Sequence, residues 1–596
     1  MSQSEAPPSA GGRGAVSPSG SVAAGIVAAG GALALSEILS GLSREIPSLV
    51  VSVADVFVDN TPGFIARWSI DTLGTAQKPA LVWGIVVVSI LLGAVLGWPS
   101  RKRPWVMPAG LAAFAVVGGW AAARNPLADG GLGWMSGLLS GAFGIAVFLS
   151  LYALATADAT AGEPETPGAE ADAERRVPMA GRGRFNDRRR FAGAVGVMAT
   201  SSLAGGLLGR WLRRRDTVEG AREGFATEAL QSRSIATPSP RSTPMPTPQA
   251  VRDAASADAS PDPSPAATAE PDADPTASAT AEPASSVTAE PLRAANFDNI
   301  AGIAPLITPN EDFYLIDTAL SYPQIDPQDW SLRIHGMVDR EVEIGFEELL
   351  DLGLVQEEVT LSCVSNSVGG RYVGNAVWVG VPLATVLEQA GVQPGATQIV
   401  GRSVDRWTAG FPTEVALDGR VAMVAVQMNG EPLPISHGFP ARLVVAGLYG
   451  YVSATKWLSD IELTTWEGFN GYWIPRGWAK EGPIKTQSRI DVPRSGSVID
   501  PGPAAIAGVA WAPSRAIERV EVQVDEEDWV EAELSRETTI NSWRQWMVAW
   551  NATPGRHQVR VRATDGTSTT QTPEISEPAP DGATGWHTIQ VRADEA

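Results

Sequence analysis

The sequence predicts a multi-domain protein with four parts: an N-terminal α-helical transmembrane region, a disordered linker, an α+β domain and a C-terminal all-β sandwich of immunoglobulin type. Three observations support this prediction. Long apolar runs are confined to the first 215 of the 596 residues, a stretch rich in Pro, Ala, Ser and Thr follows, and short apolar strands fill the rest. We place the four parts at 1–215, 216–295, 296–493 and 494–596.

The composition excludes several classes of function. Lys and Arg number 45 against 66 Asp and Glu, giving a formal net charge of −21, so the chain is a poor candidate for binding nucleic acid. A single cysteine excludes an internal disulfide, a Cys-rich zinc site, an iron–sulfur cluster held by the chain and a CxxCH haem attachment. All four histidines lie in the second half of the chain. Any redox chemistry therefore needs a cofactor that uses very few Cys or His ligands.

The first 215 residues contain five apolar runs with lengths near those needed to cross a bilayer as helices. The Gly and Ala in these runs suit close packing between membrane helices. Glu37 falls in the first run, where we expect it near the end of the span or facing other helices. A shorter stretch at 46–58 holds Asp55 and is expected to be interfacial. The five runs are 21–42, 80–98, 107–123, 134–155 and 191–208.

Basic residues between the runs predict the orientation. Arg and Lys cluster at 101–103 and 175–190, which the positive-inside rule makes cytoplasmic. A multi-pass protein of the cell membrane follows, with its second half extracytoplasmic, although the basic residues at 210–215 argue against this orientation. Arg188 and Arg189, in Asp-Arg-Arg-Arg-Phe-Ala, resemble a twin-arginine export signal, and a plain cytoplasmic basic flank explains them equally well.

Residues 216–295 are expected to be disordered. They are rich in Pro, Ala, Ser, Thr and acidic residues, with almost no aromatic side chains, so they cannot bury a core. A flexible chain of this length has an r.m.s. span of about 50 Å. We therefore expect a tether that holds the second half of the chain away from the membrane.

Short apolar strands alternate with amphipathic helical pieces between 296 and 493, which is typical of an α+β domain. The last hundred residues instead contain regularly spaced alternating strands separated by turn residues, which favours an immunoglobulin-type sandwich. The expected strands of the sandwich are 505–511, 519–524, 543–550, 558–563 and 584–591.

The single cysteine, Cys363, ends an apolar strand and precedes a Gly-containing loop at 364–370. A lone cysteine is most often a small buried hydrophobe. At a strand end it can also be a thiolate nucleophile, if a base such as His437 lies nearby, or a soft ligand for a metal. The residues by themselves leave these alternatives open.

The segment 360–392, TLSCVSNSVGGRYVGNAVWVGVPLATVLEQAGV, resembles the molybdenum-binding segment of the sulfite oxidase family, which includes methionine-sulfoxide reductase catalytic subunits. Blocks at 330–336, 434–442 and 449–457 extend the resemblance over 296–596. It implies a sulfite-oxidase-like molybdopterin-binding domain. In that family a pterin dithiolene and one cysteine, here Cys363, hold the molybdenum of the Mo-molybdopterin (molybdenum cofactor), with no haem and no iron–sulfur cluster in this chain.

The resemblance also implies contacts to the rest of the cofactor. Guanidinium, ammonium and backbone N–H groups suit its phosphate, and mixed donors and acceptors suit the pterin edge. Carried over position by position, the cofactor-binding residues are Asn310, Tyr314, Asp405, His437, Arg442, Ser453, Thr455 and Lys456.

Two departures from the family pattern bear on the substrate. Sulfite oxidases have a sulfite-binding arginine after the Phe-Tyr pair, whereas 315–318 here reads LIDT, without a cation. In a later loop, where they have an active-site tyrosine, this chain offers Trp478. A dianionic substrate needs fixed cations, so sulfite is weakened as the substrate. Arg371 and Arg476, and also Arg402, Arg406 and Lys485, are candidates for replacement charge.

We therefore expect a membrane-anchored oxidoreductase that, by resemblance, catalyses two-electron oxygen-atom transfer on a small extracytoplasmic substrate. Because the chain has no cytochrome domain, a separate electron-transfer partner is implied, and the resemblance of the sandwich to the family's dimerisation domain implies a homodimer. One alternative is a sulfoxide-type reductase fed by a membrane electron donor. An alternative of another class is a non-catalytic surface binding protein, which leaves the residues around Cys363 unexplained.

Overall fold

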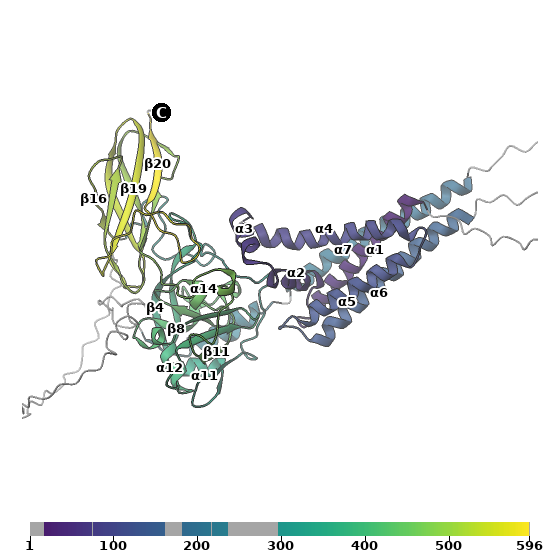
Figure 1. Cartoon of the computed structure of the whole chain (residues 1–596), viewed down its shortest axis with the longest axis horizontal. Helices are drawn as coiled ribbons and strands as arrows, with labels where there is room; N and C mark the ends of the chain where they lie inside the picture. The colour runs from purple at the N-terminus through teal and green to yellow at the C-terminus, as the bar shows by residue number, and fades with distance from the viewer. Residues whose placement is uncertain (1–16, 74–75, 161–181, 216, 237–295, 595–596) are drawn as a thin grey trace, which may run out of the picture. The chain divides into compact units, whose positions relative to one another are not determined.

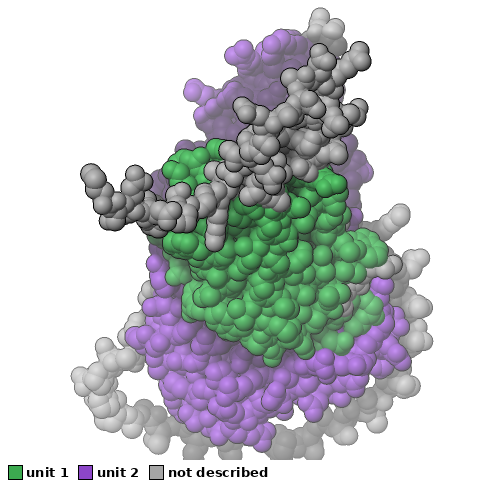
Figure 2. Space-filling model, turned by 90° about the vertical axis from the view of Figure 1, so that its right-hand side faces the viewer, with its two compact units in different colours: residues 1–221, 317–326, 404–406 green, residues 222–316, 327–403, 407–596 purple. Residues whose placement is uncertain are grey.

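The computed structural model of the chain describes residues 17–73, 76–160, 182–215, 217–236 and 296–594 (Figure 1). The chain divides into two compact units, coloured separately in Figure 2. The first unit comprises residues 1–221, 317–326 and 404–406, and the second comprises 222–316, 327–403 and 407–596.

The first unit is helical. Within the described residues, five of its helices are long and apolar enough to cross a membrane, in agreement with the five expected runs. Arg188 and Arg189 fall in the last of these helices, at positions where side chains lie outside the described part of the structure. The five helices are α1 (Pro18–Leu42), α4 (Gln77–Ser100), α5 (Val106–Ala123), α6 (Gly130–Thr160) and α7 (Arg182–Arg215), and the shorter α2 (Leu49–Asp59) and α3 (Gly63–Leu73) lie between the first two.

Glycine brings two of these helices into close contact. A Cβ atom at Gly25 of α1 would lie 2.1 Å from the carbonyl oxygen of Gly93 and 3.0 Å from Cα of Gly97, both on α4. Only residues without a side chain allow the backbones to approach this closely, as is common between membrane helices.

Glu37 of α1 is buried and paired with other elements of the first unit. Its Oε1 accepts a hydrogen bond from Ser48 Oγ at 2.5 Å, and its Oε2 lies 3.1 Å from Arg213 Nη2 of α7. The carboxylate therefore faces other helices, which is one of the two placements that the sequence predicts for an acidic residue in an apolar span.

The second unit begins with two sheets and short helices, which confirms the α+β expectation. In the first sheet, of order β1-β4-β5-β8-β10, four strands run antiparallel and β1 pairs parallel with β4. Its strands are β1 (Ile235–Ala236), β4 (Leu354–Ser362), β5 (Val373–Pro382), β8 (Ala422–Met428) and β10 (Arg442–Val445), with β9 (Glu431–Pro432) added to β8. The second sheet has the order β3 (Val342–Gly345), β2 (Ser331–Gly336), β11 (Leu458–Thr464), β6 (Gln398–Ser403) and β7 (Thr408–Pro412). The helices are α11 (Phe346–Asp351), α12 (Leu383–Glu388), α13 (Glu414–Leu417) and α14 (Gly450–Ser453).

The C-terminal part of the second unit, here called the β-rich region, consists of two sheets around one apolar core. Ile506 and Trp546 from one sheet and Val520 and Val559 from the other are buried together in that core. The immunoglobulin-type topology stays a prediction. One sheet has the order β12 (Gln487–Val492), β14 (Gly502–Trp511), β18 (Arg544–Ala552), β17 (Glu533–Leu534), and the other β13 (Val498–Ile499), β20 (His587–Ala593), β19 (Gly555–Asp565), β15 (Ile517–Val524), β16 (Val530–Glu531).

Two expected boundaries differ from the structure. The expected linker begins with ordered elements, α8 (Glu219–Ala221), η2 (Arg222–Ala226), α9 (Thr227–Gln231) and β1, because apolar side chains there are buried. The remainder of the expected linker, 237–295, lies outside the described residues. The β-rich region starts at Gln487 and not at 494, because β12 pairs antiparallel with β14.

Candidate active site

Cys363 follows β4 directly and is 8% exposed. The loop from 363 to 372 connects β4 to its antiparallel neighbour β5, so it starts and ends at the same edge of the sheet. Three hydrogen bonds close it. The Cys363 N–H donates to the Tyr372 carbonyl at 2.8 Å, the Asn366 N–H donates to the Cys363 carbonyl at 3.1 Å, and the Tyr372 N–H donates to Asn366 Oδ1 at 2.8 Å. The thiol therefore has a fixed, buried position.

Two buried phenols lie within electrostatic range of this thiol. Burial, and then Cys363, raises the pKa of Tyr314 far above its usual range, with Arg442 acting in the opposite direction. Burial raises the pKa of Tyr449 as well; the Lys485 N–H lowers it and Cys363 adds to the increase. Both phenols therefore stay protonated and can donate hydrogen bonds near Cys363.

Cationic side chains are buried on adjacent segments. His437 Nε2 lies 3.0 Å from the Asn310 carbonyl oxygen, and Arg442 Nη1 donates to the His437 carbonyl at 3.0 Å. The Arg442 guanidinium also lies 5.1 Å from the ring centroid of Trp378, a fully buried residue of β5. Because an arginine stays ionised even when buried, this site carries a permanent positive charge.

The turn beside Arg442 provides further polar groups. Lys456 Nζ donates to the Ser436 carbonyl at 2.9 Å. Gly438 has φ +111°, and a Cβ atom there would lie 3.1 Å from Lys456 Cα. Thr455 Oγ1 is buried and has no hydrogen-bond partner among the residues that the structure describes. A buried unsatisfied hydroxyl next to two cations fits a site for a bound polar or anionic group.

Three other expected cofactor contacts, Asn310, Ser453 and Asp405, stay predictions. The Asn310 side chain donates to Glu431 Oε1 at 2.5 Å, so its carboxamide is already engaged by the chain. Ser453 Oγ donates to the Tyr449 carbonyl at 3.1 Å, four residues earlier in the same turn. Asp405 lies in the turn between β6 and β7.

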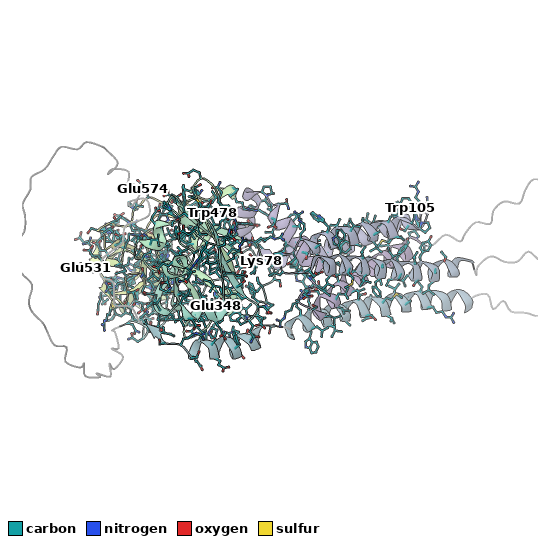
Figure 3. All side chains as sticks on the ribbon, turned by 90° about the horizontal axis from the view of Figure 1, so that it is seen from below. Lys78, Trp105, Glu348, Trp478, Glu531 and Glu574 are labelled. Carbon is teal, nitrogen blue, oxygen red and sulfur yellow. The ribbon has the colours of Figure 1, made fainter. Side chains whose placement is uncertain are left out.

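Two of the three expected substrate residues pack against aromatic side chains. Trp478, which is labelled in Figure 3, is buried. Its ring centroid lies 5.9 Å from that of Tyr451. Arg476 Nη1 donates to the Tyr472 carbonyl at 2.7 Å, and its guanidinium stacks 3.7 Å from the centroid of the Tyr472 ring. Arg371 is exposed on the loop that follows Cys363.

The β-rich region contacts the Cys363 loop directly. Arg489 Nη1 of β12 donates to the Gly370 carbonyl at 3.0 Å. His587 of β20 accepts a hydrogen bond at Nδ1 from the Ile490 N–H at 2.9 Å. Its ring lies against Gly369, where a Cβ atom would come within 2.3 Å of Nε2. Two strands of the β-rich region thus support the loop from outside the first sheet.

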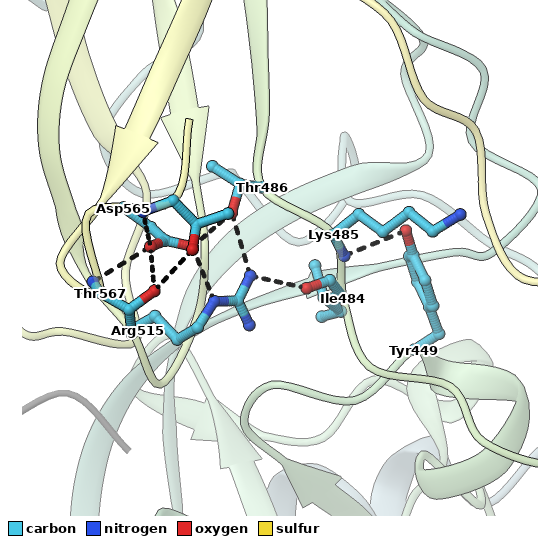
Figure 4. Close-up of polar contacts among 8 residues, drawn as sticks. Tyr449, Ile484, Lys485, Thr486, Arg515, Asp565 and Thr567 are labelled. Carbon is cyan, nitrogen blue, oxygen red and sulfur yellow. Dashed lines mark hydrogen bonds and ion pairs between the residues drawn. The ribbon is translucent and has the colours of Figure 1, made fainter. Parts of the chain in front are cut away.

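A second contact from the β-rich region leads to Tyr449 (Figure 4). Arg515 Nε lies 2.9 Å from Asp565 Oδ2, and both side chains are almost fully buried. Arg515 Nη2 donates to the Ile484 carbonyl at 2.9 Å, and the next residue, Lys485, donates its N–H to the Tyr449 hydroxyl at 3.4 Å. The buried ion pair therefore fixes the segment that contacts Tyr449.

Sequence reasoning did not identify Tyr449, Asn366, Arg489 or His587 as site residues. Tyr449 opens the block 449–457, so that block contained a signal for it. The contact of Arg489 with the Cys363 loop spans 119 positions, and the sequence alone carries no signal for it.

Within the described ranges, no group of three or more His, Cys, Asp or Glu side chains could hold a metal ion. A metal bound by Cys363 would take its other ligands from a separate group. This donor set, one thiol with cations and a free hydroxyl nearby, fits a metal carried on an anionic organic cofactor.

Comparisons with known proteins agree with this reading. Residues 319–473 match the family model described as oxidoreductase molybdopterin binding domain. Mitochondrial sulfite oxidase of Mus musculus is 28% identical over 289 residues, covering 41% of this chain and 52% of that protein, so the chain spans about half the length of this relative. The uncharacterized oxidoreductase YuiH of Bacillus subtilis (strain 168) is 32% identical over 157 residues, covering 26% of this chain and 76% of that protein.

A solved structure of the sulfane dehydrogenase SoxCD from Paracoccus pantotrophus aligns with a TM-score of 0.42 and 23% identity, over 49% of this chain and 84% of that one, a likeness too weak to support an argument. The matching domain and the sequence relatives are sufficient without it. The chain belongs to the sulfite oxidase family of molybdopterin-dependent oxidoreductases.

Proposed function

We propose that the protein is a membrane-anchored molybdenum-cofactor oxidoreductase that catalyses two-electron oxygen-atom transfer on a small extracytoplasmic substrate. The observation that carries the proposal is the buried thiol of Cys363, with Tyr314 within electrostatic range of both this thiol and Arg442. The five long apolar helices of the first unit support the anchoring.

In this proposal Cys363 is the metal ligand, since a thiolate is a soft donor that a bound metal keeps deprotonated. Arg442 and Lys456 would supply positive charge for the anionic part of the cofactor, with His437 beside Arg442, and the Thr455 hydroxyl would gain the hydrogen-bond partner that it lacks among the described residues. Asn310 acts through its carbonyl contact with His437. The bound cofactor supplies the oxygen-atom transfer chemistry, while the protein binds and orients it.

The remaining residues prepare the surroundings of the reaction. Tyr314 and Tyr449 keep their protons and would be available as hydrogen-bond donors to a bound group, and Arg442 would balance negative charge on that group. The closed loop from 363 to 372 holds the thiol in place.

Two substrate classes remain candidates. Similarity to sulfite oxidases favours oxidation of a small sulfur oxyanion. A sulfoxide-type reductase is favoured by Leu315 and Ile316, which are 40% and 39% exposed where sulfite oxidases, by resemblance, have a cation. Arg476 donates to the Tyr472 carbonyl and stacks on the Tyr472 ring, and Arg371 and Arg476 stay the candidates for a replacement charge. From the family resemblance we also propose that the protein exchanges electrons with a separate partner and forms a homodimer through the β-rich region.

The test uses the full chain, produced in cells that make the molybdenum cofactor. Metal analysis should find about one molybdenum per chain in the wild type and a large loss in Cys363→Ser. Thr588→Ser changes an exposed side chain on β20 and controls for metal loss during purification, so this variant should keep its molybdenum. Wild-type protein without molybdenum would overturn the proposal.

The direction of catalysis and the anchoring are tested separately. Sulfite-dependent reduction of an electron acceptor supports oxidation, and sulfoxide-dependent oxidation of reduced viologen supports the reductase. Anchoring predicts that detergent, and not high salt, releases the protein from membranes. The extracytoplasmic orientation predicts that protease added to intact spheroplasts cuts within 237–295.

A further inference from the structure

Residues 222–236 follow the helical unit in sequence but belong to the second unit. β1 pairs parallel with β4, and Ile235 stands opposite Leu354. The ring of Phe225 lies with its centroid 6.4 Å from that of Phe346 on α11. The buried side chains of the segment are those of Ala226, Ala229 and Leu230.

Two arginines of this segment are bound to carboxylates of the second unit. Arg222 Nη1 lies 3.3 Å from Glu431 Oε2 and donates to the Pro432 carbonyl at 2.8 Å. Arg233 Nε donates to Asp351 Oδ1 at 3.0 Å. The Arg222 side chain is 12% exposed and the Glu431 side chain 46%, so solvent screens part of this ion pair.

Glu431 connects this segment to the candidate active site. While its Oε2 faces Arg222, its Oε1 accepts a hydrogen bond from Asn310 Nδ2 at 2.5 Å. The Asn310 carbonyl oxygen lies 3.0 Å from His437 Nε2. The Glu431 carboxylate therefore contacts Arg222 of this segment on one side and Asn310, the neighbour of His437, on the other.

We propose that residues 222–236 act as a clasp: they bind the second unit non-covalently and keep Glu431 in position on Asn310. The N-terminal helices are thus attached to the second unit by a connection that is independent of residues 237–295. A further consequence, support of the cofactor site through Asn310, rests on the proposed function, whereas the attachment itself does not.

The attachment is testable by disulfide trapping, because Cys363, which is buried, is the single cysteine of the chain. Ala236 and Val355 are Cα partners on β1 and β4, so Ala236→Cys with Val355→Cys places two thiols side by side. A protease recognition sequence is inserted within 237–295. Copper(II) phenanthroline then removes two electrons from the thiol pair, two protons are released, and the protein is cut.

On a non-reducing gel the two fragments should stay joined, and reduction should separate them. The matched control is Ala236→Cys with Gln356→Cys, because the next residue of β4 points to the opposite face of the sheet. Fragments that separate in both variants, or that stay joined equally in both, would overturn the proposal.

A second measurement needs no added cysteine. After the cut, in detergent, an N-terminal affinity tag should retain the fragment that starts in 237–295. Arg222→Ala combined with Arg233→Ala should weaken this retention about tenfold or more, since two charge-assisted contacts are lost. Arg592→Ala, which removes a side chain of β20 that is 56% exposed, should leave the retention unchanged. Prompt release of the wild-type fragment would contradict the clasp, whatever the molybdenum content of the protein.

Discussion

Arg489, on the first strand of the β-rich region, donates a hydrogen bond at 3.0 Å to the carbonyl oxygen of Gly370, in the loop that begins at Cys363. The same side chain is held by Asp491, with Nε 2.6 Å from Oδ1. The loop is therefore supported on one side by the strands that it connects and on the other by the β-rich region. This arrangement makes the β-rich region part of the candidate site.

Removing this support should destabilise the loop. Arg489→Ala deletes a charge-assisted hydrogen bond and leaves Asp491 without its partner, so we expect a loss of about 1.5–3 kcal/mol in the free energy of unfolding. Denaturant titration measures this loss, and metal analysis should show a lower molybdenum content. Arg592→Ala removes an arginine that is 56% exposed and should change neither quantity. Equal losses in the two variants would show that the contact with Gly370 is not what matters.

Gly369 should tolerate no side chain. Its φ of +75° is strained for other residues, and a Cβ atom would lie 2.3 Å from His587 Nε2. Gly353→Ala is the matched control, because φ there is +103° and a Cβ atom would meet nothing within 4 Å. The control isolates the backbone strain, about 1–2 kcal/mol. Gly369→Ala should cost more than the control in denaturant unfolding; a smaller cost would mean that the His587 ring moves aside freely.

The packing of His587 predicts a pH dependence of stability. Burial, and then Arg489, lowers the pKa of His587 from 6.5 to about 4, against the opposing effect of Asp491. Between these values the unfolded chain binds a proton that the folded chain does not, so stability should fall as pH decreases from about 6.5 to about 4. His587→Gln should flatten this part of the curve of unfolding free energy against pH. Parallel curves for variant and wild type would contradict the assignment.

Much of the site was predictable because its residues lie in short sequence blocks. His437 and Arg442 are five residues apart in one block, and the structure joins them through the His437 carbonyl. The five membrane-length helices were predictable from apolar length alone.

The rest depended on contacts between distant parts of the chain. Arg222 and Leu230 stand in a polar stretch beside a Pro- and Ser-rich segment, so composition assigned them to a linker, yet Leu230 is buried and Arg222 is paired with Glu431. Similarly, the sequence places β12 in the preceding α+β domain, expected to end at 493, and only its pairing with β14 assigns it to the β-rich region. Periodicity is a local property, and these assignments depend on partners far away in sequence.

The phenol of Tyr314 should matter for turnover more than for folding. Tyr314→Phe removes the buried hydroxyl near Cys363 and keeps the ring, which stacks on Phe313 with centroids 5.3 Å apart. We expect kcat to fall by on the order of 10²-fold, as for loss of a positioned proton donor, with molybdenum content unchanged. Tyr451→Phe is the control, because its hydroxyl donates to the Ala479 carbonyl at 2.6 Å and serves local structure. If kcat falls equally in Tyr451→Phe and Tyr314→Phe, the Tyr314 hydroxyl has no special role in turnover.

The last prediction concerns the buried pair of Arg515 and Asp565. Burial opposes ionisation of Asp565, but hydrogen bonds from Thr486 and Thr567 and the charge of Arg515 outweigh it, so the pKa of Asp565 is lowered. Arg515→Met would leave this carboxylate buried without its cation, at a cost of about 3–5 kcal/mol in the free energy of unfolding.

Loss of Arg515 should also lower kcat, because Arg515 donates to the Ile484 carbonyl and the next residue, Lys485, donates its N–H to the Tyr449 hydroxyl. Arg515→Lys keeps the positive charge but loses the planar guanidinium, which contacts Asp565 and the Ile484 carbonyl at the same time. Relative to Arg515→Met, it should therefore restore the free energy of unfolding more fully than kcat. Unfolding curves and kcat measured on both variants check this, with Arg519→Met, 44% exposed on β15, as the control. If Arg515→Lys restores both quantities to the same degree, the charge alone is responsible, and the donation to Ile484 does not position Tyr449.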